Sequence, residues 1–197
     1  MTTLKTDVTL TGVGIHSGNP VNVVVRPSDK KGIFWRRVDL PNSELIAATY
    51  DNVGDTKMRN TTIGNKNGAH VQTVEHLMAA LFIAGVDSAI VEIDGVETPI
   101  LDGSAAQFID AFVGAGVGAG KMKRIVVKKE VVVHAKDALK DLPRALRMKI
   151  WLMNKLTGRK SDGFVSLAPN DKNELEIKAT LVYPEKIIGK QSFTYVY

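Results

Sequence analysis

The chain contains no cysteine. Disulfide bonds and thiolate metal sites are therefore excluded, and any bound metal ion must be held by histidine, aspartate or glutamate. The most apolar run, Leu77 to Val86, is too short to span a bilayer. The N-terminal residues Met1 to Asp7 also lack the apolar centre of a signal peptide. We therefore expect a soluble cytoplasmic protein.

Aromatic residues are scarce, at 6% of the chain, and they do not alternate with basic residues in the pattern of a base-stacking surface. The net charge of +5 is concentrated in residues 136–160, where eight basic and two acidic residues give a local charge of +6. The rest of the chain then carries −1. A protein with one basic segment on a neutral body lacks a broad phosphate-binding surface, so we expect no nucleic-acid partner.

The 197 residues are 44% hydrophobic, with a mean hydropathy of −0.02, which is typical of a globular protein of one or two domains. Val21, Val23 and Val25 alternate with other residues up to Pro27 and predict a strand. Further strands are predicted from Gly32 and over Ala89–Ile93, and helices from Thr73 and from Ser104. Strands followed by helix, strand and helix predict an α+β fold with helices on one face of a sheet.

The helix predicted from Thr73 carries a carboxylate and an imidazole in its first turn, at Glu75 and His76. Thr73 is the expected N-cap, and an apolar face at helical spacing is expected to pack into a core. The positive N-terminus of a helix favours ionised Glu75 and neutral His76, the forms that accept a proton and bind a metal ion. The alternative is an ordinary polar pair in a first turn.

The second helix is predicted by a capping box, in which Ser104 and Gln107 would bond reciprocally at its start. Asp102 and Gly103, which precede it, are interpreted as a structural turn. The glycine-rich run 114–120 is the best candidate linker in the chain. It predicts a first α+β domain over residues 1–117 and a partial second domain over residues 121–197.

The second domain is predicted to consist mostly of strands. They are expected over Arg124–Val133, Gly163–Ala168, Glu174–Val182 and Ser192–Tyr197. A basic amphipathic insertion interrupts them at about residues 136–160, and its regular helix is expected after Pro143. Its apolar stripe comprises Leu139, Leu142, Leu146, Ile150, Met153 and Leu156. The stripe either covers the otherwise bare sheet or lies on an anionic membrane surface.

Four segments occur together in the order and spacing of one family: Gly12–Gly18, Asp55–Thr56, Thr73–Leu81 and Pro99–Ser104. Over about its first 115 residues the chain resembles the zinc-dependent UDP-3-O-acyl-N-acetylglucosamine deacetylases of lipid A biosynthesis. The resemblance implies two domains, each with helices packed on a β-sheet, and an active site between them. It also implies a UDP-linked acylated amino sugar as substrate and Zn²⁺ as cofactor, with acetate as a product.

By the same resemblance, Glu75 is the general base, His76 is one of three zinc ligands, and His16 lies near the passage for the acyl chain. The loop with Lys57, Met58 and Arg59 would contact substrate, although it carries an extra residue. His70 and His134 have no motif around them and are expected at the surface.

The family's other two zinc ligands lie in a His-Lys-x-x-Asp motif, and its catalytic acid is a further histidine. Neither is found in this sequence, whose histidines are His16, His70, His76 and His134. We therefore expect an incomplete form of a family deacetylase that is inactive on its own. The alternative is a non-catalytic remnant or binding module of the same fold.

Overall fold

The computed structural model describes residues 1–54, 60–120, 126–157, 163–172, 174–183 and 185–196. The chain divides into two compact units, Met1–Lys123 and Arg124–Tyr197. The predicted boundary between two folding domains remains a prediction. Each unit is described here by itself.

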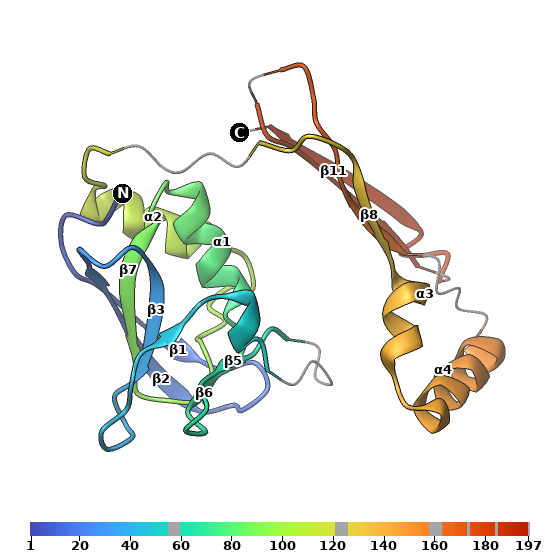
Figure 1. The fold of residues 1–197 in the computed structure, drawn as a ribbon, viewed down its shortest axis with the longest axis horizontal. Coiled ribbons are helices and arrows are strands. Elements are labelled where there is room, and N and C mark those ends of the chain that lie inside the picture. Colours follow the sequence, from blue (N-terminus) through green and yellow to red (C-terminus); the bar gives the residue numbers. More distant parts are fainter. Residues whose placement is uncertain (55–59, 121–125, 158–162, 173, 184, 197) are drawn as a thin grey trace. The chain divides into compact units, whose positions relative to one another are not determined.

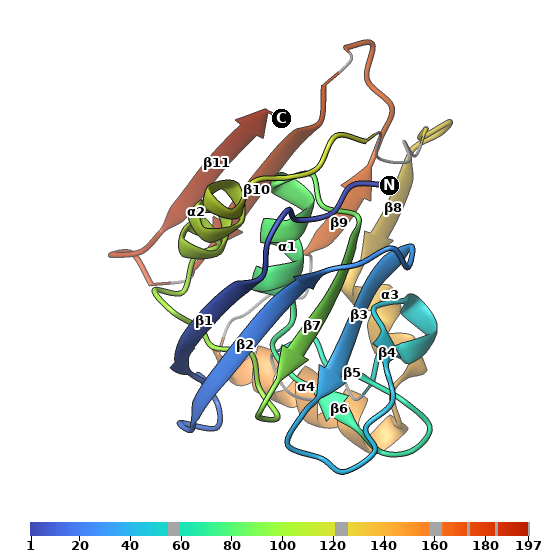
Figure 2. The ribbon, with the colours of Figure 1, turned by 90° about the vertical axis from the view of Figure 1, so that its left-hand side faces the viewer.

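A five-stranded sheet organises the first unit. It contains β1 (Val8–Val13), β2 (Pro20–Pro27), β7 (Ser88–Ile93), β3 (Gly32–Arg37) and β4 (Ile46–Ala47), in that spatial order (Figure 2). Neighbouring strands are antiparallel except β3 and β7, which are parallel. A 3-10 turn (Tyr50–Asn52) and a short hairpin of β5 (Ile63–Gly64) and β6 (His70–Val71) follow β4 along the chain.

Alternation along the strands buries one face of the sheet. The strand pairing aligns five residues in one row across the sheet, all of them buried: Val8, Val25, Val91, Trp35 and Ile46. Helices α1 (Glu75–Ile83) and α2 (Ala106–Ala115) lie against this face (Figure 1). Leu77 and Leu81 of α1 and Phe108 and Phe112 of α2 are buried in the same core. The predicted α+β fold, with both helices on one face, is confirmed.

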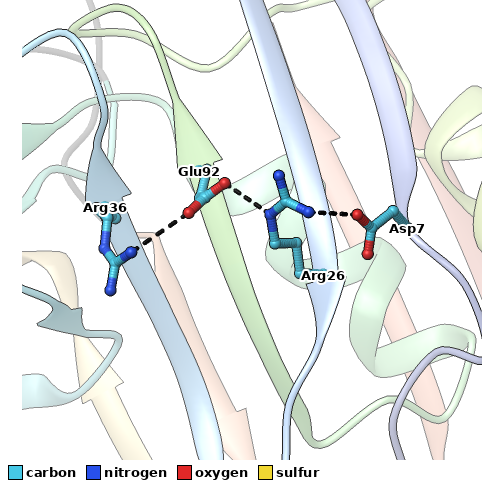
Figure 3. Close-up of polar contacts among 4 residues, drawn as sticks. All are labelled: Asp7, Arg26, Arg36 and Glu92. Atoms are coloured by element: carbon cyan, nitrogen blue, oxygen red, sulfur yellow. Dashed lines mark hydrogen bonds and ion pairs between the residues drawn. The ribbon is translucent and has the colours of Figure 1, made fainter.

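The opposite face of the sheet carries a row of charged side chains. Glu92 accepts hydrogen bonds from Arg26 Nε, at 2.7 Å, and from Arg36 Nη1, at 3.4 Å. Arg26 also pairs with Asp7 (Figure 3). The hydrogen bond and charge of Glu92 raise the pKa of the Arg26 guanidinium above its ordinary value. Because the two faces differ so strongly in polarity, the pairing register of the sheet is well specified.

The two predicted helix caps are not formed as expected. Helix α1 begins at Glu75 rather than Thr73, and its N-cap residue, Val74, makes no side-chain capping hydrogen bond. The prediction of Thr73 as cap was wrong, because the Thr73 hydroxyl donates instead to Glu97. Ser104 Oγ does accept a hydrogen bond from the Ala106 amide at the start of α2, at 3.1 Å.

The predicted reciprocal capping box was also wrong. The Ser104 amide, which Gln107 would bond in such a box, donates to Asp102 Oδ1 at 2.9 Å. This bond is the main reason why the pKa of Asp102 lies below its ordinary value. Asp102 and Ser104 thus form the structural turn that the sequence indicated.

The first part of the predicted linker is tied to the first unit. Gly114 and Ala115 end helix α2, and Val117 forms a β-bridge with Leu4. The Lys5 amide donates to the carbonyl of Gly116 at 2.9 Å. Residues up to Gly118 therefore pack with the N-terminal segment rather than acting as a free connection.

The second unit consists of two antiparallel hairpins and a helical insertion. Strands β8 (Val131–His134) and β9 (Phe164–Leu167) form one hairpin, and β10 (Glu176–Val182) and β11 (Lys190–Val196) form the other. Strand β8 begins later than predicted, whereas the other three lie where the sequence placed them. Between β8 and β9 lie α3 (Ala135–Ala138), a 3-10 turn (Leu139–Asp141) and α4 (Arg144–Thr157). The prediction of a regular helix after Pro143 is confirmed.

Helix α4 is apolar on more than the predicted stripe. Leu146 and Ile150 are half-buried, whereas Met153 and Leu156 of the same stripe are exposed. Met148, Trp151 and Leu152, which lie outside the stripe, are also exposed. Among the described side chains of this unit, none is fully buried. None of the helices in the described ranges is long and apolar enough to cross a membrane.

Candidate active site

Glu75 and His76 occupy the first turn of helix α1, and both side chains are half-buried. The fully buried Leu77 and Leu81 anchor this helix in the core. Glu75 Oε2 accepts a hydrogen bond from the Thr61 amide at 3.1 Å. Successive helical residues diverge by about 100°, so Glu75 and His76 project in different directions from one turn.

The chain enters α1 through an unusual backbone conformation. Thr73 has a φ of 57°, a left-handed value that β-branched residues rarely adopt. Its side chain is buried, and its hydroxyl donates to Glu97 Oε1 at 3.0 Å. The next amide, that of Val74, donates to the carbonyl of Thr61 at 3.3 Å. Thr61 thus bonds to both residues that follow Thr73, Val74 and Glu75.

His16 lies exposed in the turn that connects β1 and β2. Two backbone hydrogen bonds close this turn, from Gly14 N to Asn19 O and from Gly18 N to Gly14 O, both at 3.0 Å. The backbone amide of His16 points at the carboxylate of Glu97, at 3.0 Å from Oε1. His16 and Thr73, two residues before α1, therefore contact the same buried side chain.

Glu97 is the residue that sequence reasoning missed. Its side chain is almost completely buried, with 2% of its surface exposed. Burial raises the pKa of the carboxyl. Hydrogen bonds from the backbone amides of His16 and Ser17, together with those from the Ser17 and Thr73 side chains, outweigh burial, so the pKa of Glu97 lies below its ordinary value. The signal in the sequence is a lone acidic residue two positions before the Pro99–Ser104 motif.

The segment that carries Glu97 lies between the residues that precede α1 and the end of strand β1. On one side, Gln72 N donates to Val96 O at 2.8 Å and Thr98 N donates to Gln72 O at 3.0 Å. On the other side, Ile100 N donates to Val13 O at 3.0 Å.

Glycines in the Gly12–Gly18 motif permit this close approach. A Cβ atom on Gly12 would lie 2.8 Å from Pro99 Cβ, and one on Gly14 would lie 2.3 Å from Glu97 Oε2. Three of the four motifs found in the sequence therefore meet around Glu97.

Within the described residues, neither His70 nor His134 contacts Glu97. His70 is exposed, as expected, with its Nδ1 3.2 Å from Gly68 O, whereas His134 is half-buried beside Phe164, with ring centroids 5.9 Å apart. Asp55, Thr56 and the loop residues Lys57, Met58 and Arg59 lie outside the described residues. Within the described part of the chain, no group of three or more histidine, aspartate and glutamate side chains could hold a metal ion.

Comparison with known proteins finds relatives over most of the chain. A deacetylase of UDP-3-O-acyl-N-acetylglucosamine from Geotalea uraniireducens (strain Rf4) is 46% identical over 138 residues, which is 68% of this chain and 44% of the relative. A second, from Teredinibacter turnerae, is 43% identical over 71% of this chain and 46% of the relative. A third, from Syntrophus aciditrophicus (strain SB), is 36% identical over 97% of this chain and 52% of the relative.

All three relatives are deacetylases and therefore belong to the hydrolase class of enzymes. The chain belongs to the family described as UDP-3-O-acyl N-acetylglycosamine deacetylase (LpxC), whose model matches residues 1–150. The resemblance carried by the sequence motifs is thereby confirmed. The chain spans about half the length of the curated relatives that it matches.

Proposed function

We propose that the whole protein to which these residues belong hydrolyses the acetamide group of UDP-3-O-acyl-N-acetylglucosamine and releases acetate in lipid A biosynthesis. Membership of the deacetylase family supports this function. The observation that carries it is the placement of Glu75 in the first turn of a well-packed helix. The Thr61 amide orients one carboxylate oxygen, and within the described residues the other oxygen, Oε1, accepts no hydrogen bond.

Glu75 would act as the general base. Its Oε1 would take a proton from the water molecule that attacks the acetamide carbonyl carbon. The new bond to carbon forms as that proton moves to the carboxylate. The carbon–nitrogen bond then breaks as the nitrogen takes up a proton from an acid of the whole protein, which releases the amino sugar and acetate. General bases of this kind contribute about 10²–10⁴ in rate. His16, exposed in its turn, would contact the acylated substrate.

His76 is proposed as one of the ligands of a zinc ion in the whole protein. A catalytic zinc site uses three protein ligands. The described residues hold no group of three or more histidine, aspartate and glutamate side chains that could bind a metal ion, so they do not form such a site by themselves. We therefore propose that residues 1–197 are inactive alone and bind well under one zinc ion per chain. We further propose two domains, residues 1–117 and 121–197, of which the second is completed elsewhere in the whole protein.

A chimera tests the role of Glu75. The chain would be continued after Tyr197 with the remaining part of the Syntrophus aciditrophicus deacetylase, which matches it over 97% of its length. We expect the chimera to release acetate from UDP-3-O-acyl-N-acetylglucosamine and the 197-residue chain to release none. Glu75→Ala in the chimera should retain the metal content and lower the rate about 10²–10⁴-fold.

The matched control for this test is Glu92→Ala, which removes a carboxylate from the charged face of the five-stranded sheet, opposite the helices. An active Glu75→Ala chimera would exclude Glu75 as the base. Stoichiometric zinc in the 197-residue chain, lost in His76→Ala, would show that it carries a complete site. A chimera that folds with zinc but has no activity would favour a non-catalytic binding module.

A peripheral contact with an anionic membrane is proposed for helix α4. Its exposed apolar residues Met148, Trp151 and Leu152 lie among basic residues, and Arg144, Arg147, Met148 and Trp151 line a shallow open hollow. The Lys155 ammonium lies 5.2 Å from the centre of the Trp151 ring. Basic side chains beside tryptophan and aliphatic groups are the composition of helices that lie in a membrane interface. Such a contact suits an enzyme with an acylated substrate.

A further inference from the structure

The carboxylate of Glu97 takes no part in the proton transfer proposed above, yet it contacts both segments that carry candidate site residues. It accepts hydrogen bonds from His16 N at 3.0 Å and from Ser17 N at 2.7 Å. A third, from Thr73 Oγ1, is 3.0 Å long. Burying a charged group is costly unless it is paired or hydrogen-bonded, so these donors explain why Glu97 is tolerated in the interior.

The contact between Glu97 and Thr73 is connected to Glu75 through a chain of hydrogen bonds. The left-handed conformation of Thr73 is costly for a β-branched residue and persists only where its surroundings hold it. The hydrogen bond to Glu97 supplies part of that restraint. Thr73 is followed by the Val74 amide, which is bonded to Thr61 O, and the Thr61 amide in turn bonds Glu75 Oε2.

A second contact supports the same connection. Asn60 Nδ2 lies 3.5 Å from Thr73 Oγ1, at the outer limit of a hydrogen bond. Residues 60–61 therefore contact Thr73, Val74 and Glu75 in succession. A shift of the Thr73 side chain would move these residues and with them the amide that orients the Glu75 carboxylate.

The position of Glu97 is itself well determined. Val96 and Thr98, which flank it, both bond to the backbone of Gln72. Further along the chain, the Ile100 amide donates to Val13 O, and no space remains for a Cβ atom on Gly14. The carboxylate is therefore held in one position, where it bonds both the His16–Ser17 amides and the Thr73 hydroxyl. Side chains held in this way can fix the relative geometry of two segments far apart in the sequence.

We propose that Glu97 is a positioning residue that joins the turn bearing His16 to the first turn of α1 and thereby orients Glu75. It acts through Thr73 and the residues around Thr61 and does not touch the reacting atoms. The inference rests on the proposed function, because Glu75 gives the first turn of α1 its chemical role. The charge of Glu97 is essential, since a neutral side chain accepts fewer and weaker hydrogen bonds from these donors.

The test compares Glu97→Gln with Glu92→Gln in the 197-residue chain, by NMR of the backbone amides. Glu97→Gln should move the His16 and Ser17 amide proton resonances upfield and speed their hydrogen exchange about tenfold, the factor for a loss of about 1.4 kcal/mol. It should also shift the Thr61 amide, which bonds Glu75 rather than Glu97. Glu92→Gln removes an equal charge from the open face and should leave all three resonances in place.

Thr73 provides an independent pair of variants. Thr73→Val keeps the shape of the side chain but removes the hydroxyl, so it should shift the Thr61 amide while the Ser17 amide stays near its original position. Thr73→Ser keeps the hydroxyl and should restore the Thr61 resonance. A general loss of stability would not separate valine from serine in this manner.

The proposal is overturned if the Thr61 amide is unchanged in both Glu97→Gln and Thr73→Val, or if Glu92→Gln shifts it equally. Should Glu97→Gln fail to fold, the comparison of Thr73→Val with Thr73→Ser decides. These resonances are measured without substrate or metal. If Glu75→Ala in the chimera retained its rate, the proposed function would fail while the positioning result would stand.

Discussion

Arg37 illustrates how a single charged residue is accommodated in the core of the first unit. Its side chain is buried, with 8% of the residue exposed, and its guanidinium bonds Asp39 through Nε at 2.7 Å and Nη2 at 2.5 Å. Arg37 Nη1 also donates to His70 O at 3.0 Å. The hydrogen bonds from Arg37 lower the pKa of Asp39 below its ordinary value. The pair therefore connects strand β3 to the short strand β6 that precedes α1.

At the residue scale we predict that Asp39→Asn destabilises the chain by about 1–3 kcal/mol at pH 7, because a buried guanidinium loses a bidentate charged partner. Because the folded pKa of Asp39 is depressed, its contribution is present above the ordinary aspartate value of about 3.9 and is lost as the pH falls through the lower folded value. Denaturant unfolding at pH 7 and at pH 3 measures both effects.

The deficit of Asp39→Asn relative to the unsubstituted chain should therefore shrink at pH 3. Asp29→Asn, at an exposed position, is the control and should change little at either pH. A deficit for Asp39→Asn that is equal at both pH values would mean that the charge of Asp39 is not what stabilises Arg37.

At the same scale, the sequence predicted where Glu75 and His76 lie but not what holds them. Their placement follows from the local helical pattern, which needs no distant residue. Glu97 escaped prediction because a single carboxylate among apolar neighbours has no local signature. Its partners at His16, Ser17 and Thr73 lie 24 to 81 residues away along the chain. The same distant bond explains why the Thr73 cap was predicted wrongly.

Among the elements, helix α4 departs most from the pattern of the rest of the chain. Its start was predictable, because Pro143 lacks an amide hydrogen and is favoured just ahead of a helix. The exposure of its other apolar residues was not predictable, because the apolar stripe read from the sequence accounts for only one side of the helix. None of the described α4 side chains is fully buried, so the membrane contact and the covering role both remain predictions.

For this element we predict salt-sensitive binding to vesicles that contain phosphatidylglycerol, measured by co-sedimentation. Each basic residue near an anionic surface contributes about 1 kcal/mol. Trp151 is a useful reporter because the other tryptophan, Trp35, is fully buried. Its fluorescence should shift to shorter wavelength on binding, and Arg144→Gln with Arg147→Gln should weaken the binding.

Lys172→Gln, an exposed basic residue elsewhere in the second unit, is the matched control and should leave binding unchanged. Absence of salt-sensitive binding, together with loss of folding in Leu146→Asp, would establish instead that the stripe of α4 covers a sheet.

Buried apolar side chains are unevenly distributed between the two units. Every fully buried apolar side chain in the described residues belongs to the first unit. The second unit has well-formed hairpins, yet its apolar residues, such as Phe164, Ile187 and Phe193, remain exposed. Isolated two-stranded hairpins are at best marginally stable in water. The strands of this unit were predictable from their alternation. The exposure of its apolar residues was predicted only in part, from a sheet that the sequence left bare unless the α4 stripe covers it.

At this scale we predict that limited trypsin digestion of the 197-residue chain leaves a protected fragment that contains residues 1–118. The first cuts should fall at Lys128 and Lys129, which are exposed outside any strand, or within residues 136–160. Hydrogen exchange should be slow in β2, β7 and α1 and fast throughout the second unit. Lys30 and Lys31, in the turn between β2 and β3, are internal controls that should be cut later. Equal exchange protection in both units would contradict the prediction.

The close approach of Gly14 to Glu97 has a consequence for sequence variation among relatives. A methyl group at position 14 would lie 2.3 Å from both Glu97 Oε2 and Ser17 Oγ, so it fits only if both side chains move away. Alanine at position 14 should therefore occur only with aspartate rather than glutamate at position 97 and with a residue smaller than serine at position 17. Positions 14 and 97 would then vary together among relatives, although 82 residues lie between them in the chain.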